Sequence, residues 1–180
     1  MNLVNLDETT RRYMLEEIEL DTTEGKLYYS KRLTAKGRSD YEGALREAVQ
    51  NHDADWLADQ LNREGRMHGV EVARSKRGRV YPKRTPSGDH LTVAYGEFNR
   101  FYIRGLCARA IAEGIDHLIV YRAREVRVAR RRSMAKLGSH VDPQNLLDDL
   151  RENIGRATRL GIPGGPNSGI SVKLPERNSQ

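Results

Sequence analysis

Apolar residues recur at helical spacing in some parts of the chain and at alternate positions in others. The first helical stretch covers residues 8–20, where Met14 and Ile18 share a face. Asp7 precedes this stretch, and an aspartate in that place caps the first turn of a helix. The apolar cluster that follows predicts a short strand over residues 27–29.

A second helical region begins near Tyr41 and continues to Leu61, with a break near His52. The break predicts two short helices or one kinked helix. The second half is acidic, and carboxylates there would repel a phosphate backbone, so we do not expect a DNA-reading helix-turn-helix. Its acidic side chains are candidates to meet a basic surface of another molecule: Asp53, Asp55 and Asp59.

The broadest apolar stripe lies in residues 96–112 and predicts a central helix. Gly105 in its middle costs about 1 kcal/mol relative to alanine, which indicates a close neighbour packed against it. The continuous apolar run 118–121 predicts a buried strand. Asp142 followed by Pro143 is typical of a helix start, so a last helix is expected from there.

Residues 69–95 alternate short apolar positions with basic ones around a central glycine, Gly78. This pattern predicts a basic β-hairpin or extended loop. Its few apolar residues cannot bury it, because an isolated two-stranded ribbon is marginally stable in water. We therefore expect the segment to project from the domain and contact another molecule through these side chains: Arg74, Lys76, Arg77, Arg79, Lys83 and Arg84.

The chain ends in a segment rich in glycine and proline, residues 161–180, which cannot form a helix. Ile170, Val172 and Leu174 alternate within it and predict a strand that joins a sheet edge, either the chain's own or a neighbour's. We expect residues 1–160 to form a single α+β domain, with four to five helices packed on a small sheet, and residues 161–180 to form an extended arm.

Composition limits the function classes. Apolar residues make up 37% of the chain and charged residues 31%, so the core is expected to be modest. No run approaches the roughly 18 apolar residues of a membrane span, and the start lacks the pattern of a signal peptide, so we expect a cytoplasmic protein without a membrane partner. The single cysteine, Cys107, excludes an internal disulfide and a cysteine-based zinc site.

Charge is unevenly distributed. Residues 1–70 hold 10 basic and 14 acidic side chains, whereas residues 71–141 hold 16 basic and 6 acidic ones. Three interpretations remain open: contacts between the acidic part of one copy and the basic part of another, binding to phosphates, and a solvated surface that keeps the protein soluble. The basic part also includes Arg127, Arg130, Arg131 and Arg132.

The chain contains no recognisable catalytic motif. The five histidines are scattered, and the glycines after residue 160 lack the lysine and helix of a phosphate-binding loop. Asp21, Glu24 and Lys26 resemble the acid and lysine element of magnesium-dependent nucleases, but a helix end followed by a turn explains them as well. We expect no cofactor and no small-molecule substrate.

Four segments of the chain, residues 2–10, 96–106, 120–123 and 165–175, carry a resemblance to other proteins. In these segments the sequence resembles a group of short proteins from tailed phages and prophages. It implies a virion component, made in the host cytoplasm during assembly and then carried in the virion, and it brings no catalytic signature. The leading hypothesis is a non-enzymatic structural protein, head-associated, accessory capsid or connector, whose partners are its own copies or other phage structural proteins. The alternatives are a nucleic-acid-binding protein that uses the basic middle segment and, more remotely, a small metal-dependent nuclease.

Overall fold

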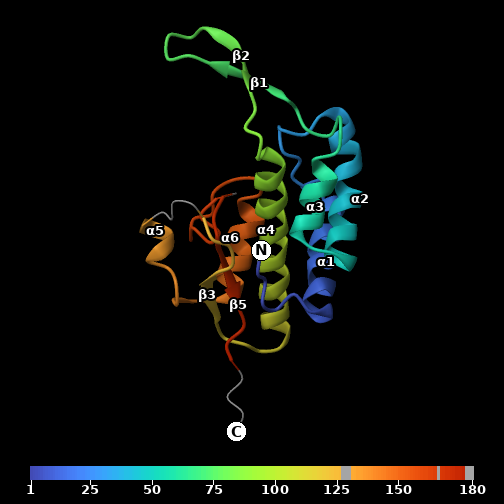
Figure 1. Cartoon of the computed structure of the whole chain (residues 1–180). Helices are drawn as coiled ribbons and strands as arrows, with labels where there is room; N and C mark the ends of the chain where they lie inside the picture. Colours follow the sequence, from blue (N-terminus) through green and yellow to red (C-terminus); the bar gives the residue numbers. More distant parts are fainter. Residues whose placement is uncertain (127–130, 166, 177–180) are drawn as a thin grey trace.

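A long central helix organises the molecule. The computed structural model describes residues 1–126, 131–165 and 167–176. The central helix α4 (Asp89–Ala112) has helices on one side and a small sheet with a further helix on the other (Figure 1). Phe98, Tyr102 and Leu106 are fully buried along it. The helix predicted for residues 96–112 is confirmed, and it begins earlier, at Asp89.

Three helices form the layer on one side of α4: α1 (Glu8–Thr23), α2 (Ala35–Asn51) and α3 (Ala54–Leu61). Asp7 caps α1 as expected, with its Oδ1 accepting from the Thr10 amide at 2.9 Å. The break near residue 52 separates α2 from α3 as two helices.

The strand predicted for residues 27–29 is wrong. That segment has no regular structure, because it pairs with none of the strands in the described part of the chain. Its apolar residue Leu27 is buried in the core instead.

The layer on the other side of α4 holds a three-stranded antiparallel sheet with strand order β4-β3-β5. The central strand β3 (Leu118–Arg122) confirms the predicted buried strand, and β4 (His140–Val141) is short. Helix α6 (Pro143–Glu152) begins as predicted, and Asp142 caps it by accepting from the Asn145 amide at 2.7 Å. A four-residue helix, α5 (Arg131–Met134), was not expected from the pattern. The structure is therefore of the α+β class.

The C-terminal segment corrects the sequence prediction. Strand β5 (Ile170–Lys173) pairs with β3 of its own chain, and Ile170 and Val172 are completely buried. Leu174 is partly buried against the core, and its amide donates to Asn5 Oδ1 at 2.9 Å. The predicted arm therefore belongs to the domain, and Ile170, Val172 and Leu174 do not form a contact surface for a neighbour, because the chain's own core takes up their apolar side chains. Pro166 and residues 177–180 of that predicted arm lie outside the described residues.

Helices α1 and α4 approach each other closely at Gly105. A β-carbon at this position would lie 2.7 Å from Met14 Cγ and 2.8 Å from the Met14 backbone nitrogen. A glycine is therefore required here for packing, which is the reason that the sequence pattern suggested.

We expect Gly105→Ala to lower the free energy of unfolding by about 1–3 kcal/mol, because the added methyl group forces two packed helices apart. Gly43→Ala in α2 is the matched control, since a β-carbon there meets nothing within 4 Å. The control should be neutral or stabilise by up to about 1 kcal/mol through helix propensity. Urea unfolding of both variants checks this, and equal stability of Gly105→Ala and the wild type would contradict the packing argument.

Candidate functional site: the projecting ribbon and the cavity at its base

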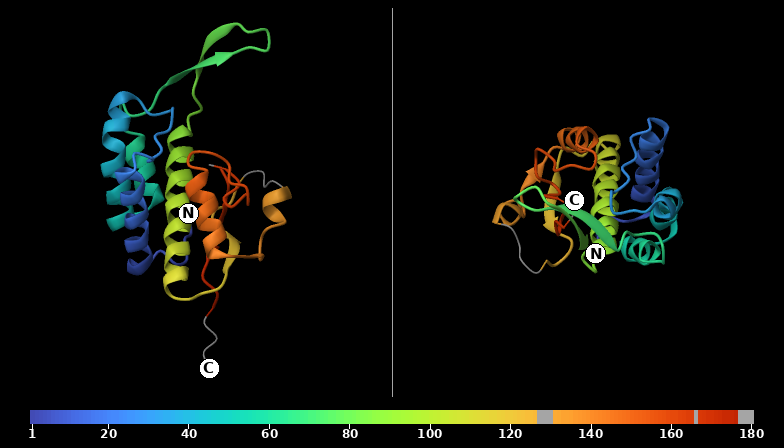
Figure 2. Two further views of the ribbon diagram at one scale, coloured as in Figure 1. Left: turned by 180° about the vertical axis from the view of Figure 1, so that it is seen from behind. Right: turned by 90° about the horizontal axis from the view of Figure 1, so that it is seen from above.

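A two-stranded hairpin stands away from the helices and the sheet. Strands β1 (Val70–Arg74) and β2 (Val80–Arg84) pair antiparallel with each other and form a separate two-stranded sheet. Figures 1 and 2 show this hairpin, here called the ribbon (residues 70–84), beyond the end of α4. The predicted projecting hairpin is confirmed with shorter bounds, because residues 89–95 belong to α4.

The ribbon is strongly basic and exposed. Its one acidic residue, Glu71, forms an ion pair with Lys83 at 3.5 Å. The other basic side chains have no ion-pair partner among the described residues, so their charge is available to another molecule. All the predicted contact residues of this segment are exposed: Arg74, Lys76, Arg77, Arg79, Lys83 and Arg84.

One face of the ribbon carries its three valines and Pro82, flanked by Arg74 and Arg84. Val72 lies opposite Pro82, and Val80 lies opposite Arg74. Because opposed residues of a strand pair share a face and side chains alternate along each strand, Val70 joins this face. The exposed fraction of Val72 is 81%, and those of Val80 and Val70 are 54% and 51%. The chain itself leaves these apolar side chains in solvent.

The predicted acidic counterparts lie on α3 and are partly used within the chain. Asp53 caps α3 by accepting from the Trp56 amide at 2.9 Å. Asp55 accepts from the Tyr95 hydroxyl, which lowers the pKa of Asp55, and it pairs with the Met1 amino group at 3.3 Å. Asp59 is exposed. Only Asp59 therefore keeps a free carboxylate among the three in the described part of the chain.

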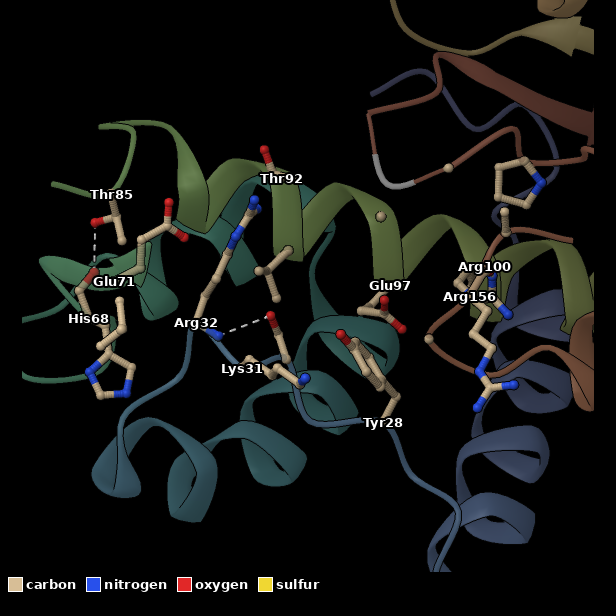
Figure 3. Close-up of a pocket in the computed structure, with 18 of the residues that line it drawn as sticks. Tyr28, Lys31, Arg32, His68, Glu71, Thr85, Thr92, Glu97, Arg100 and Arg156 are labelled. Atoms are coloured by element: carbon tan, nitrogen blue, oxygen red, sulfur yellow. Dashed lines mark hydrogen bonds between the residues drawn. The ribbon is translucent and has the colours of Figure 1, made fainter. Parts of the chain in front are cut away.

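A cavity of about 660 Å³ lies at the base of the ribbon. Figure 3 shows that its lining comes from the loop after α1, the start of β1, the first turns of α4 and the loop after α6. Its polar lining is mainly cationic, with one deeply buried carboxyl group, that of Glu97. Charged and aromatic residues of the lining include Tyr28, Lys31, Arg32, His68, Glu97 and Arg156.

Glu97 has an unusual environment. Burial raises the pKa of Glu97 to about 7, although the nearby Arg100 guanidinium acts in the opposite direction. The carboxyl group makes no hydrogen bond or ion pair within the described residues, and in Figure 3 it points toward Tyr28. Near neutral pH it can therefore exist in either protonation state. No sequence pattern marked it, because its unusual pKa comes from burial against segments that are distant in the sequence.

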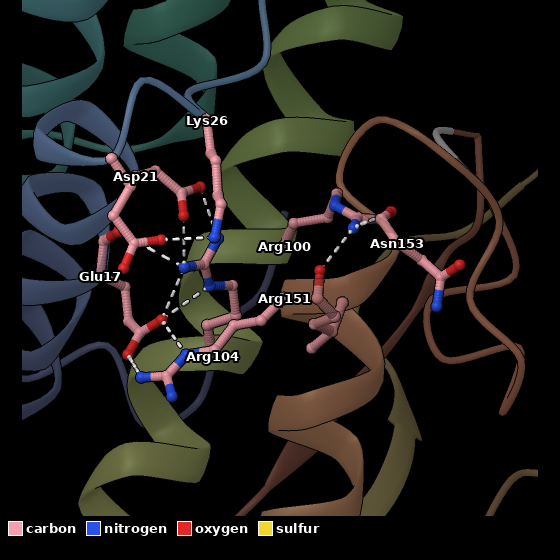
Figure 4. Close-up of polar contacts among 9 residues, drawn as sticks. Glu17, Asp21, Lys26, Arg100, Arg104, Arg151 and Asn153 are labelled. Atoms are coloured by element: carbon pink, nitrogen blue, oxygen red, sulfur yellow. Dashed lines mark hydrogen bonds and ion pairs between the residues drawn. The ribbon is translucent and has the colours of Figure 1, made fainter.

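Arg100 holds one wall of the cavity in place. Its guanidinium donates to the backbone oxygens of Asn153, Arg156 and Leu150 at 2.7, 3.0 and 3.2 Å (Figure 4). These contacts tie the loop after α6 to α4. All three acceptors are uncharged carbonyl groups, so Arg100 serves the structure of the wall.

Of the residues that resemble a nuclease element, Asp21, Glu24 and Lys26, only Asp21 belongs to a buried ion-pair network (Figure 4). Arg104 binds both carboxylate oxygens of Asp21, at 2.6 and 2.8 Å, and its Nε donates to Glu17 at 2.8 Å. Glu24 instead pairs with Lys26 at 2.6 Å. Asp21 is thus occupied by an arginine, and no group of three or more metal-ligating side chains converges within the described residues.

Two further predictions concern residues outside the ribbon. Cys107 is completely buried, and burial raises the pKa of its thiol. Arg131 and Arg132 are exposed on α5, whereas Arg127 and Arg130 lie outside the described residues. None of the helices in the described part of the chain is long and apolar enough to cross a membrane.

Comparison of the chain with protein-family models, curated proteins and solved structures gives no match. No relative therefore indicates the class of this protein, and a function can be proposed only from the chemistry of the ribbon.

Proposed function

We propose that this protein is a non-enzymatic structural component of a phage particle that docks onto its neighbours through the ribbon. The observation that carries this proposal is the exposed apolar face of the ribbon, with Val72 81% exposed, next to five basic side chains that have no ion-pair partner in the described residues. An interface requires both an apolar centre and charged groups that set its orientation.

The ribbon also lacks a face that is packed against the rest of the domain. Two-stranded hairpins without a packed face are marginally stable in water. The ribbon extends beyond the helices (Figure 2), and its valines stay at least half exposed, so a second molecule can cover them. The resemblance of the sequence to short tailed-phage proteins supports a virion as the assembly in which that molecule is found.

Particle incorporation tests the proposal. Tailed-phage particles produced by the strain that encodes the chain are purified on a density gradient and probed for it. We expect the wild-type chain to sediment with the particles. A fourfold variant should be at least tenfold enriched in the unassembled fraction relative to the wild type. Its substitutions are Arg74→Gln, Lys76→Gln, Arg77→Gln and Arg79→Gln.

The control variant carries the same change of charge at exposed positions outside the ribbon, on α1, after α3 and on α5. It should be incorporated like the wild type. Absence of the wild-type chain from purified particles would refute the proposal. The control substitutions are Arg12→Gln, Arg63→Gln, Arg131→Gln and Arg132→Gln.

A DNA-binding function is the second candidate. The width of the DNA major groove admits a two-stranded β-ribbon, and the unpaired arginines of this ribbon are suitable phosphate ligands. This candidate predicts binding to a 20-base-pair duplex that weakens steeply between 50 and 200 mM salt and is lost in the fourfold ribbon variant. Fluorescence anisotropy measures it, and binding that does not respond to salt would exclude it.

A further inference from the structure

The two outer edges of the ribbon differ in their backbone hydrogen-bonding groups. At one end of the ladder the Ser75 amide donates to Arg79 O at 2.9 Å, and at the other end the Thr85 amide donates to Gly69 O at 3.2 Å. Hydrogen-bonded and non-hydrogen-bonded pairs alternate along an antiparallel ladder. The odd-numbered residues of β1 therefore bond to β2, and its even-numbered residues direct their N–H and C=O groups outward.

The outer edge of β2 is blocked in its centre. Pro82 lies opposite Val72 in a non-hydrogen-bonded pair, so its position is one that would otherwise direct an N–H group outward. Proline has no N–H group, so a proline on an edge strand hinders the addition of another strand. An incoming strand cannot form a continuous ladder on β2.

The outer edge of β1 is open. Val70, Val72 and Arg74 each direct an N–H and a C=O group outward, and no partner for these groups occurs among the described residues. All three residues are exposed. Such an edge is a template for one more strand.

The charge of the ribbon indicates which kind of strand can add to the outer edge of β1. A second copy's ribbon is equally basic, so pairing two ribbons would bring like charges together. The chain's other strands in the described residues are committed to the sheet beside α4, and its predicted acidic counterparts lie on the helix α3. An added strand therefore comes from a different protein and carries acidic side chains.

We propose that the outer edge of β1 binds an extended acidic segment of a partner protein as a third antiparallel or parallel strand. Residues of that segment on the valine face are apolar and cover Val70 and Val72, their neighbours on β1, while its carboxylates on the other face reach the basic turn at Lys76 and Arg77. This inference rests on the proposed docking function and names the chemistry of the docked segment.

The first experiment uses a peptide as the probe. An end-capped eight-residue peptide of alternating valine and glutamate is titrated into the ¹⁵N-labelled full chain. We expect the amide resonances of Val70, Val72 and Arg74 to shift and their hydrogen exchange to slow at least tenfold. The amides of Glu71 and Ala73, which already bond to β2, should change less. Absence of protection at the three outward amides would overturn the proposal.

A matched pair of variants separates strand addition from attraction by charge alone. Val72→Pro removes one outward N–H group without breaking the ladder between β1 and β2, whereas Val72→Thr keeps that group. We expect at least tenfold weaker peptide binding for the proline variant and little change for the threonine variant. Unfolding curves that match the wild type confirm that both variants fold.

Three other outcomes each decide the question. Equal peptide binding by Val72→Pro and Val72→Thr would overturn strand addition, because the peptide would then bind through electrostatic attraction alone. Binding to a 20-base-pair DNA duplex but not to the peptide would assign the ribbon to nucleic acid. Normal incorporation of Val72→Pro into particles from which the fourfold variant is excluded would overturn the strand while leaving the docking function intact.

Discussion

Arg104→Ala is expected to lower the free energy of unfolding by about 3–5 kcal/mol. Arg104 is buried and compensates two buried carboxylates, those of Glu17 and Asp21. Without its guanidinium, Asp21 loses both of its charge-assisted hydrogen bonds, and only Arg151 remains beside Glu17. An uncompensated buried charge costs far more than the loss of a surface ion pair.

Chemical denaturation at pH 7 measures this effect. Arg12→Ala is the control, because Arg12 forms an exposed pair with Glu16 on α1 at 3.9 Å, and such pairs contribute at most about 1 kcal/mol. Arg151→Ala should fall between the two variants, since Arg151 is only partly buried but also binds Glu17. A loss below about 1 kcal/mol for Arg104→Ala would show that the network is not needed for the packing of α1 against α4.

Glu97→Gln is expected to change how stability depends on pH. Burial raises the pKa of Glu97 from 4.5 to about 7, so the folded protein holds this proton more tightly than the unfolded chain does. Stability therefore falls as the pH rises from about 4.5 to about 7, and the loss is complete above that range. This shift in pKa corresponds to a loss of about 3 kcal/mol in the free energy of unfolding, and the glutamine variant should not show that loss.

Urea unfolding of the wild type and of Glu97→Gln at pH 4.5 and pH 8 checks this prediction. As the pH rises, the free energy of unfolding of the variant should increase by about 3 kcal/mol relative to that of the wild type. Any constant effect of the substitution cancels in this comparison. The same pH dependence in both proteins would mean that Glu97 is solvated or paired in solution.

Local signals in the sequence predicted much of the fold. Asp7 and Asp142 marked helix starts because a capping aspartate acts within its own first turn. The ribbon was predicted because its apolar residues were too few to be buried. The early turns of α4 were missed, since Asp89, His90 and Thr92 are polar residues typical of a loop, and their apolar neighbours are too few to show a helical stripe.

The cavity and the buried network depend on residues that are far apart in the sequence. Arg104 and Glu17 are separated by 87 positions, and Arg151 and Glu17 by 134. Periodicity shows which residues share a face of one element, but it does not show which faces meet. The sequence did not show which strand β5 pairs with, for the same reason. Alternation predicts a strand, but it does not predict the strand beside it.

The connection between the ribbon and α4 has a mechanical consequence. Strand β2 leads through residues 85–88 directly into the helix that touches both layers of the domain. Strand β1 is joined through residues 62–69 to α3, so the hairpin has a second connection to the helical layer. A force on the hairpin therefore divides between two helices of the domain, α3 and α4, and neither helix bears it alone.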